Sequence, residues 1–114
     1  MSSQLPNYLR SNRKRAALSQ EDVAFLLGAL NGSQVSRYEH FDRMPGLKTA
    51  LAFEVIYQKP VKELFAGIYK KIEQEVAARA RVRAKQENRG KGGRLTNKRK
   101  GTFLKLTTPK NPNE

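Results

Sequence analysis

The sequence predicts an all-α fold: a compact bundle of five helices, the fifth of them extended, followed by a basic, flexible C-terminal tail. Apolar residues recur at helical spacing in five successive segments. Turn-forming Gly, Pro and Asn separate these segments, and from Arg89 onward the composition changes to Gly, Lys, Arg, Asn and Thr. A chain of 114 residues, 38% of them hydrophobic, has enough apolar side chains for one small core.

The first two helices are expected at residues 7–17 and from Ser19 onward. Ser19 is suited to be the N-cap of the second helix, and Asp22, in the third helical position, completes a capping-box-like pair. The apolar stripe of this helix consists of Val23, Leu26, Leu27 and Leu30. Phe25 lies off the stripe by roughly half a turn, so it either covers the first or fourth helix or contacts a partner.

A turn marked by Gly28 and by Asn31-Gly32 leads to a third helix over Ser33–Glu39. Val35 and Tyr38 are expected to face inward. The outer face consists of Ser33, Gln34, Ser36 and Arg37. This face is more polar than packing alone requires. In a chain with a formal net charge of +13, two short helices joined by a tight turn have the outline of a helix-turn-helix, which lays one helix in the major groove of DNA.

Pro45-Gly46 interrupts the chain before a fourth helix over Leu47–Tyr57. Its inner face is expected to consist of Leu47, Ala50, Leu51 and Val55. Glu54 projects onto the same face, so we expect it to be a packed carboxylate paired with Arg10 or Arg13.

A fifth helix starts at Pro60 and is expected to run to Asn88. Its apolar stripe, about 120° wide, consists of Val61, Leu64, Phe65, Ile68, Ile72 and Val76. Arg79 and Arg83 occupy the same stripe further on, so packing on that face must end near Val76. The resulting division is a helix-turn-helix domain at residues 1–76, a basic helix extension at 77–88 and a basic, mostly disordered tail at 89–114.

Positive charge is concentrated in the second half of the chain. Residues 1–60 hold 8 Lys/Arg against 5 Asp/Glu, whereas residues 61–114 hold 15 against 5. The basic tail is either a solvated, self-repelling segment or a contact for a polyanion such as DNA, or for a protein partner. Within it, the β-prone segment Thr102–Thr107 is expected to pair as an edge strand or to dock on another surface.

Several classes of function are excluded by residues that the sequence lacks. It contains no cysteine, and its single histidine, His40, has no companions for a zinc site. It also shows no nucleophile with an adjacent base and no phosphate-cradling glycine loop, so we expect neither an enzyme nor a cofactor or metal. With no signal peptide and no apolar run long enough to cross a bilayer, a cytoplasmic protein without membrane contact is expected.

An ordered set of residues and short motifs runs from Tyr8 to Phe65. It comprises Arg13, Leu18-Ser19-Gln20, Ala24, Gly28, Val35-Ser36-Arg37-Tyr38-Glu39, Pro45 and Glu63-Leu64-Phe65. This set resembles the Cro and phage-repressor class of helix-turn-helix regulators, the lambda-repressor-like, XRE-type DNA-binding domains. The resemblance implies a five-helix bundle, sequence-specific DNA binding, usually as a dimer on a two-fold operator, and a buried pair between Arg13 and Glu39. The sequence departs from the pattern in a turn one residue longer between Gly28 and Val35, and in Asn12 and Glu54 at sites that are usually apolar.

The third helix carries the predicted base contacts. Arg37 is suited to a bidentate pair with guanine O6 and N7, which provides about 1–3 kcal/mol of discrimination. The alternative is that Arg37 pairs with Glu39 or with solvent and touches only phosphate. Contacts to base edges concentrate at the amino end of a recognition helix. The other predicted contacts on this helix are Ser33, Gln34 and Ser36.

Predicted phosphate contacts flank the third helix. Asn31 and Gly32 are expected to offer backbone amides at the positive end of the helix. Gln20 matches a position that, in the family resembled, binds a phosphate oxygen; the alternative is a first-turn residue without a role. Arg43 and Lys48 are predicted by their charge alone.

The sequence therefore predicts a transcriptional regulator that binds double-stranded DNA sequence-specifically. The apolar stripe of the fifth helix extends beyond what a five-helix core needs, which favours a homodimer with half-sites about 34–36 Å apart. Two alternatives stay open. One is an antitoxin-like or other partner-binding module whose DNA binding serves autoregulation. The other is an architectural or RNA-binding protein that binds nucleic acid without sequence preference.

Overall fold

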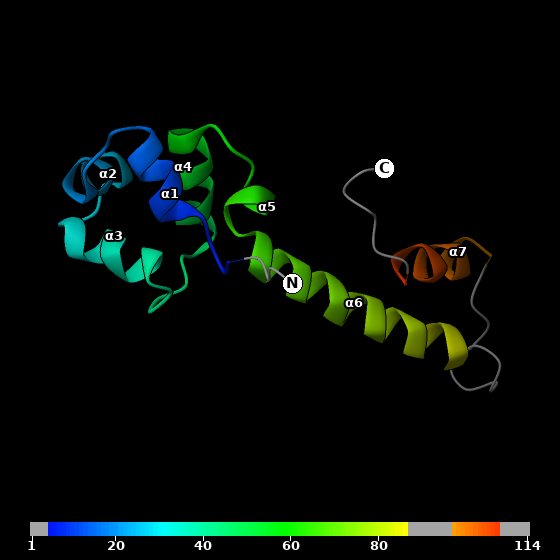
Figure 1. Cartoon of the computed structure of the whole chain (residues 1–114). Coiled ribbons are helices and arrows are strands. Elements are labelled where there is room, and N and C mark those ends of the chain that lie inside the picture. The colour runs from blue at the N-terminus through cyan, green and yellow to red at the C-terminus, as the bar shows by residue number, and fades with distance from the viewer. Residues whose placement is uncertain (1–4, 87–96, 108–114) are drawn as a thin grey trace. The chain divides into compact units, whose positions relative to one another are not determined.

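The protein is described here from a computed structural model that covers residues 5–86 and 97–107, and every regular element in those residues is an α-helix (Figure 1). The helices are α1 (Leu9–Arg15), α2 (Gln20–Leu27), α3 (Gly32–Glu39), α4 (Leu47–Tyr57), α5 (Val61–Leu64), α6 (Ala66–Gln86) and α7 (Asn97–Leu106). The predicted all-α class is confirmed. The chain divides into two compact units, with the boundary between Tyr69 and Lys70.

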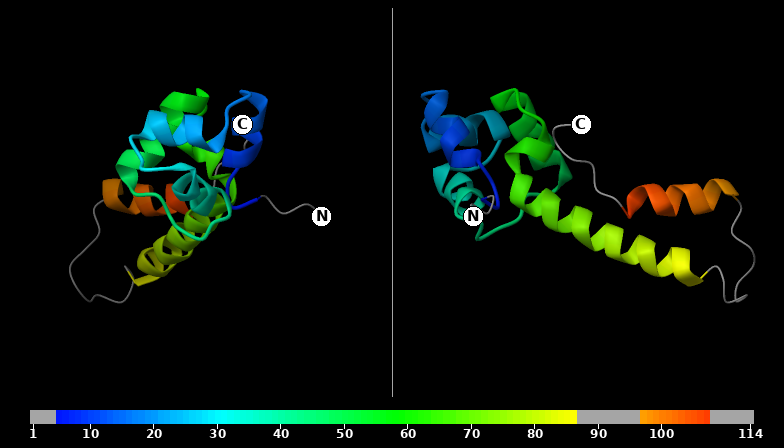
Figure 2. Two further views of the ribbon diagram at one scale, coloured as in Figure 1. Left: turned by 90° about the vertical axis from the view of Figure 1, so that its left-hand side faces the viewer. Right: turned by 45° about the vertical axis from the view of Figure 1, so that its right-hand side comes forward.

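Helices α1 to α5 of the first unit pack around one small core (Figure 2). Its buried residues are Leu9, Val23, Ala24, Val35, Phe53, Tyr57, Leu64 and Phe65. The ring of Phe53 lies 5.9 Å from that of Tyr38, 6.0 Å from Tyr57 and 6.5 Å from Phe65, measured between centroids. Each such aromatic pair adds about 0.5–1.5 kcal/mol to the stabilisation from buried area. One aromatic side chain of α4 thus joins α3 to the segment after α5.

The ends of α2 follow the local signals in the sequence. The Ser19 hydroxyl accepts from the Asp22 amide at 3.0 Å, and the Asp22 carboxylate accepts from the Ser19 amide at 2.9 Å, so the predicted capping box is confirmed. Hydrogen bonding of its carboxylate, mainly to the Ser19 amide and also to the Ser19 side chain, lowers the pKa of Asp22. Gly28 ends the helix in the left-handed conformation with a φ of 74°, which glycine adopts without steric cost.

The predicted inner face of α4 is correct only for Ala50, which is half-buried and packs against the core. Phe53 and Tyr57, one turn apart, are buried, while Leu47, Leu51 and Val55 face solvent. At about 100° per residue, two apolar stripes compete on this helix. The stripe with two aromatic rings buries the larger area and makes the ring contacts described above.

The predicted stripe of α2 is only partly correct. Val23 is buried and Leu27 is half-buried, but Leu26 and Leu30 are exposed. The helix ends at Leu27 and the chain turns at Gly28, so Leu30 no longer lies on the helical surface. Phe25 is 84% exposed, so the prediction that it covers the first or fourth helix is also wrong.

The predicted fifth helix is interrupted. Phe65 leaves the helical region, with a φ of −121° and a ψ of 43°, and separates the single turn of α5 from α6. Glu54 accepts a hydrogen bond of 2.9 Å from the Val61 amide at the start of α5, instead of pairing with Arg10 or Arg13. The other polar departure, Asn12, donates to the Tyr8 carbonyl at 2.8 Å. The predicted helix end at Asn88 lies outside the described residues.

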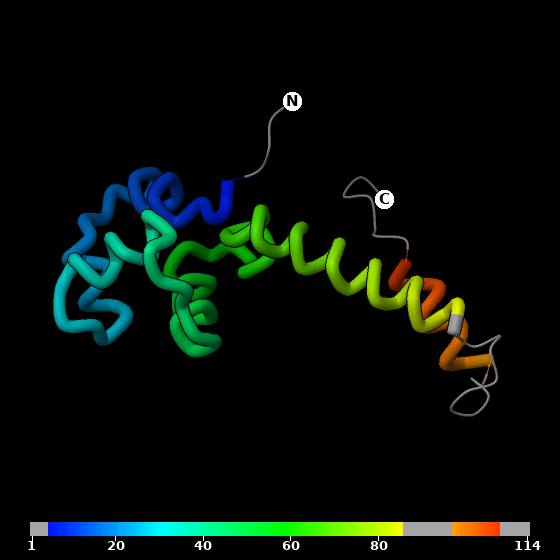
Figure 3. Tube along the Cα trace, turned by 90° about the horizontal axis from the view of Figure 1, so that it is seen from below, coloured from blue at the N-terminus to red at the C-terminus, as the bar shows by residue number. Residues whose placement is uncertain are grey.

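The second unit contains most of α6, which Figure 3 shows as one unbroken helix, and α7. Residues 97–106, predicted to lie in a disordered tail with a β-prone segment, form α7, so that prediction is wrong for them. The hydroxyl of Thr102 donates to the Lys98 carbonyl at 3.1 Å, the bond that a threonine within a helix can make to the preceding turn. Arg81 donates to the Thr107 carbonyl at 3.3 Å, linking α6 to the end of α7. Residues 89–96 and 108–114 of the predicted tail lie outside the described residues.

Candidate nucleic-acid interface

Helix α3 turns its polar side chains outward, as the sequence predicts. Val35 is fully buried and Tyr38 packs against Phe53, so the expected inner face is confirmed. Ser33 and Arg37 are exposed, and Gln34 and Ser36 are half-exposed. These four side chains share the solvent side of one short helix, where nothing in the core requires them.

The turn before α3 is built by a cap and a close approach. Asn31 Oδ1 accepts from the Ser33 amide at 3.0 Å and is also contacted by the Ser33 hydroxyl, so Asn31 is the N-cap. The Gly32 amide donates to Glu21 Oε1 at 2.8 Å. A Cβ at Gly32 would lie 2.8 Å from that oxygen and 3.1 Å from Gln20 Cβ, so a larger residue would displace the Glu21 carboxylate and crowd α2. The Gly32 amide is already bonded, which corrects the prediction that it is offered to a phosphate.

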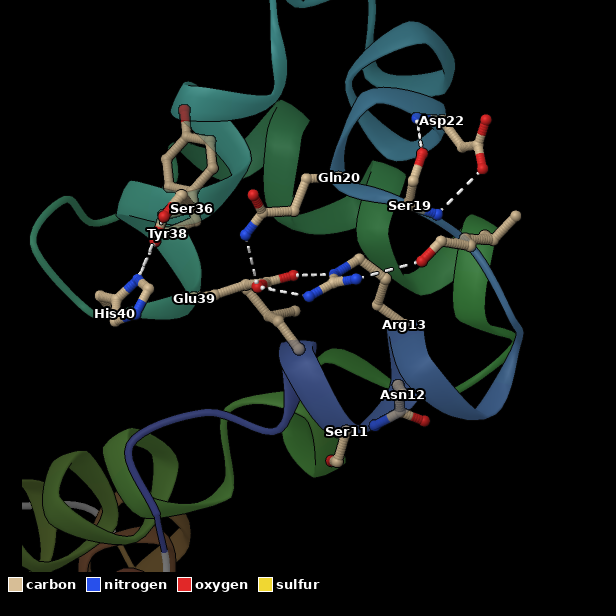
Figure 4. A network of polar contacts seen from close by, with 12 residues as sticks. Ser11, Asn12, Arg13, Ser19, Gln20, Asp22, Ser36, Tyr38, Glu39 and His40 are labelled. Atoms are coloured by element: carbon tan, nitrogen blue, oxygen red, sulfur yellow. Dashed lines mark hydrogen bonds and ion pairs between the residues drawn. The ribbon is translucent and has the colours of Figure 1, made fainter.

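A buried ion pair fixes α3 to α1 and α2 (Figure 4). Arg13 Nε donates to Glu39 Oε2 at 2.6 Å and Nη2 donates to Glu39 Oε1 at 3.2 Å, which confirms the pair implied by the family resemblance. Nη1 of the same arginine donates to the Leu18 carbonyl at 3.1 Å. The bonds to Glu39 raise the pKa of Arg13. The side chain of Glu39 is almost inaccessible, so loss of either partner would leave an uncompensated charge and cost about 3–5 kcal/mol.

Gln20 belongs to the same network. Its Nε2 donates to Glu39 Oε1 at 3.1 Å, which holds the first residue of α2 beside the last residue of α3 (Figure 4). Both oxygens of Glu39 are therefore engaged by Arg13 and Gln20, so the alternative pairing of Arg37 with Glu39 is not the one that forms. Gln20 itself is half-exposed.

The remaining predicted contacts lie on both sides of α3. Arg43 is exposed in the loop after α3, and Lys48 is exposed in the first turn of α4. His40, at the C-cap of α3, donates from Nδ1 to the Ser36 carbonyl at 2.8 Å and lies 3.2 Å from the Ser36 hydroxyl. Sequence reasoning missed this cap on the carboxyl end of α3, because the bond depends on the helix ending at Glu39 and not on a recognisable motif.

Two other features, a cluster of metal ligands and a helix able to span a membrane, are absent from the part of the chain that the structure describes. Among residues 5–86 and 97–107, no three His, Asp or Glu side chains gather in a way that would hold a metal ion. In the same residues, no helix combines the length and the apolar character needed to cross a bilayer.

Comparison with known proteins identifies the same region. A family model described as Helix-turn-helix, a family of DNA-binding domains, matches residues 9–64, which run from the first residue of α1 to the last of α5. No curated protein and no solved structure gives a match. The segment predicted to hold one residue more than the usual turn, between Gly28 and Val35, contains the left-handed Gly28 and the N-cap Asn31.

Proposed function

We propose that the chain, which belongs through residues 9–64 to the helix-turn-helix family of Cro and the phage repressors, is a sequence-specific regulator of transcription that binds double-stranded DNA. In this proposal α3 enters the major groove and presents its outer side chains to base edges. Arg37 pairs with a guanine. Ser33, Gln34 and Ser36 contribute the shorter contacts near the amino end of the helix.

The observation that carries the proposal is that hydrogen bonds fix both ends of α3 to neighbouring helices. An outer face of four polar side chains is held on a helix whose last residue, Glu39, is bonded to both α1 and α2. The first turn is fixed in the same way, by the Asn31 cap and the bond from Gly32 to Glu21. A recognition helix needs this rigidity, because discrimination between bases depends on side chains held in fixed positions relative to the base edges.

Phosphate contacts complete the proposed interface. Gln20, Asn31, Arg43 and Lys48 surround α3 and reach the backbone of the DNA on either side of the groove. Gly32 takes part through its missing side chain, which allows the close approach of α2 and α3, and not through its amide. Such contacts set the register of the protein on the duplex and carry no sequence information of their own.

The proposed regulator works as a homodimer. A single helix of eight residues reads few bases. A two-fold pair of such helices reads two half-sites, about 34–36 Å apart when they lie one helical turn from each other. Whether transcription is repressed or activated depends on where the operator lies relative to the promoter, a property of the DNA and not of this chain.

Selection of bound duplexes from a random DNA pool tests the proposal. We expect one preferred sequence with two-fold symmetry, and a dissociation constant at least about a thousandfold lower than for unrelated duplexes. Equal affinity for selected and random duplexes would contradict the proposal and favour an architectural protein. A preferred sequence without two-fold symmetry would support base recognition by α3 and contradict the homodimer.

The basic C-terminal half is proposed to add affinity that does not depend on sequence. Residues 89–100 hold six basic side chains and no acidic one. Each phosphate neutralised contributes about −0.9 to the slope of log affinity against log salt. Truncation after Asn88 is therefore expected to flatten that slope by several units and to leave the preferred sequence unchanged. An unaltered slope would show that the tail binds a protein or nothing.

A further inference from the structure

Six large apolar side chains of the first unit face solvent on adjoining elements. They are Phe25 and Leu26 on α2, Leu30 in the turn after it, and Leu47, Leu51 and Val55 on α4. Helices α2 and α4 pack against each other, and the three residues on α4 follow at four-residue spacing, so they form a strip along that helix. We call these six residues the α2–α4 apolar surface. None of the outer side chains of α3 belongs to it.

The exposure of this surface is large for a small domain. Leu30 is 89% exposed, Leu47 76% and Val55 68%. Together the six side chains expose an apolar area on the order of 700 Å², compared with about 300–600 Å² for the largest patch on a typical monomer. A standard protein interface covers about 800 Å² on each partner, so this area suffices for one stable contact.

Charge indicates which partner fits. Residues 20–31 hold two acidic side chains and no basic one, and residues 47–57 hold one of each, although the whole chain has a net charge of +13. Two copies of so basic a chain repel each other over most of their surface. The α2–α4 apolar surface is a place where a second copy can approach without that repulsion, because the elements that form it lack the positive excess.

We propose that two copies of the chain associate through their α2–α4 apolar surfaces, in an isologous two-fold contact. The inference rests on the homodimer within the proposed function and names its interface. The apolar stripe of α6, from which the sequence predicted the dimer, is the weaker candidate. Ile72 and Val76 are 50% and 39% exposed, and Tyr69 on the same side of the helix is 41% exposed, but Arg79 and Arg83 continue the same stripe. A contact along that stripe would bring these cations towards a second copy of a basic chain.

Sedimentation equilibrium of the full-length chain without DNA tests the interface. The double variant Leu51→Glu/Val55→Glu places acidic groups in the α4 strip, and Ile72→Glu/Val76→Glu makes the same change on α6 as a matched control. We expect the wild-type chain to be a dimer at micromolar concentration. The α4 variant should raise the dimer dissociation constant at least about tenfold, and the α6 variant should leave it unchanged.

Each other result has a defined meaning. Dissociation by the α6 variant alone would overturn this interface and keep the homodimer. A wild-type chain that stays monomeric would overturn both this interface and the homodimer. If the α4 variant lowers the thermal midpoint of unfolding, Phe25→Glu on α2 repeats the test at a residue outside the core, and an unchanged dissociation constant there overturns the interface. Because no DNA is present, failure of the proposed DNA specificity appears only in the duplex selection and is separable from these outcomes.

Discussion

Helices α3 and α4 each turn one face to solvent, but the two faces differ in kind. The outer face of α3 is polar, and the sequence predicted it correctly; the outer face of α4 is apolar, and the sequence predicted it as core. The difference follows from an asymmetry in burial. Burying a polar side chain without a partner costs about 1–3 kcal/mol, whereas an apolar side chain in solvent is common in folded proteins. A polar pattern therefore identifies the outside of a helix more securely than an apolar pattern identifies its inside.

The largest effects should separate the two apolar stripes of α4. Phe53→Ala removes a fully buried ring that contacts three other rings, so we expect the free energy of unfolding to fall by about 3–5 kcal/mol. Leu51→Ala, on the outer strip, should change it by less than about 0.5 kcal/mol when the measurement is made below the concentration at which the chain dimerises. Chemical denaturation of both variants, monitored by circular dichroism, measures the difference. A loss at Leu51 that equals the loss at Phe53 would contradict the orientation of α4.

A comparable loss of stability is expected at the ion pair that holds α3 against α1. Glu39→Ala leaves the guanidinium of Arg13 buried without its partner, and the free energy of unfolding should fall by about 3–5 kcal/mol. Arg37→Ala, two residues earlier on the exposed face, is the matched control and should leave stability unchanged. Chemical denaturation of the two variants measures both changes in the free energy of unfolding. A small loss at Glu39 would mean that the α3 face is held by its packing and not by the ion pair.

The outer face of α3 is tested by DNA binding instead of stability. Arg37→Ala should weaken binding to the preferred duplex by about 1–3 kcal/mol and relax the preference at one base position, because the lost contact is to a base edge. Binding to the preferred duplex, to single-base variants of it and to an unrelated duplex provides the measurement. An equal loss on all of them would assign Arg37 to phosphate.

What the sequence predicts well is local. The capping box of Ser19 with Asp22 and the helix end at Gly28 depend on residues within one turn, and both are confirmed. The contacts of Glu54 and Gln20 depend on partners 7 and 19 residues away, and no spacing rule indicates them. The pair of Arg13 with Glu39, 26 residues apart, was available only through the family resemblance. The choice between two apolar stripes on α4 likewise depends on which neighbours are in reach.

A smaller effect is expected at Tyr57, on the inner face of α4. Its hydroxyl is buried and forms no hydrogen bond with any of the described residues. Such a group costs about 1–3 kcal/mol to desolvate. Tyr57→Phe removes that cost and keeps the stacked contact with Phe53, so stability at neutral pH should stay within about 0.5 kcal/mol of the wild type or rise. A clear loss of stability would reveal a partner for the hydroxyl, such as an ordered water.

The same variant makes a prediction at alkaline pH. Burial, with the nearby charge of Glu39, raises the pKa of Tyr57 to about 12, from 10.0 in the unfolded chain. Between these two values the unfolded state loses the phenolic proton and the folded state keeps it, so stability is complete below about pH 10 and falls as the pH rises towards about 12. Tyr57→Phe should remove this contribution and make the alkaline fall shallower. Thermal unfolding of both proteins at several pH values between about 9 and 11.5 measures it. If stability falls equally with pH in the two proteins, water reaches the Tyr57 hydroxyl. The inner face of α4 would then be less buried than the structure indicates.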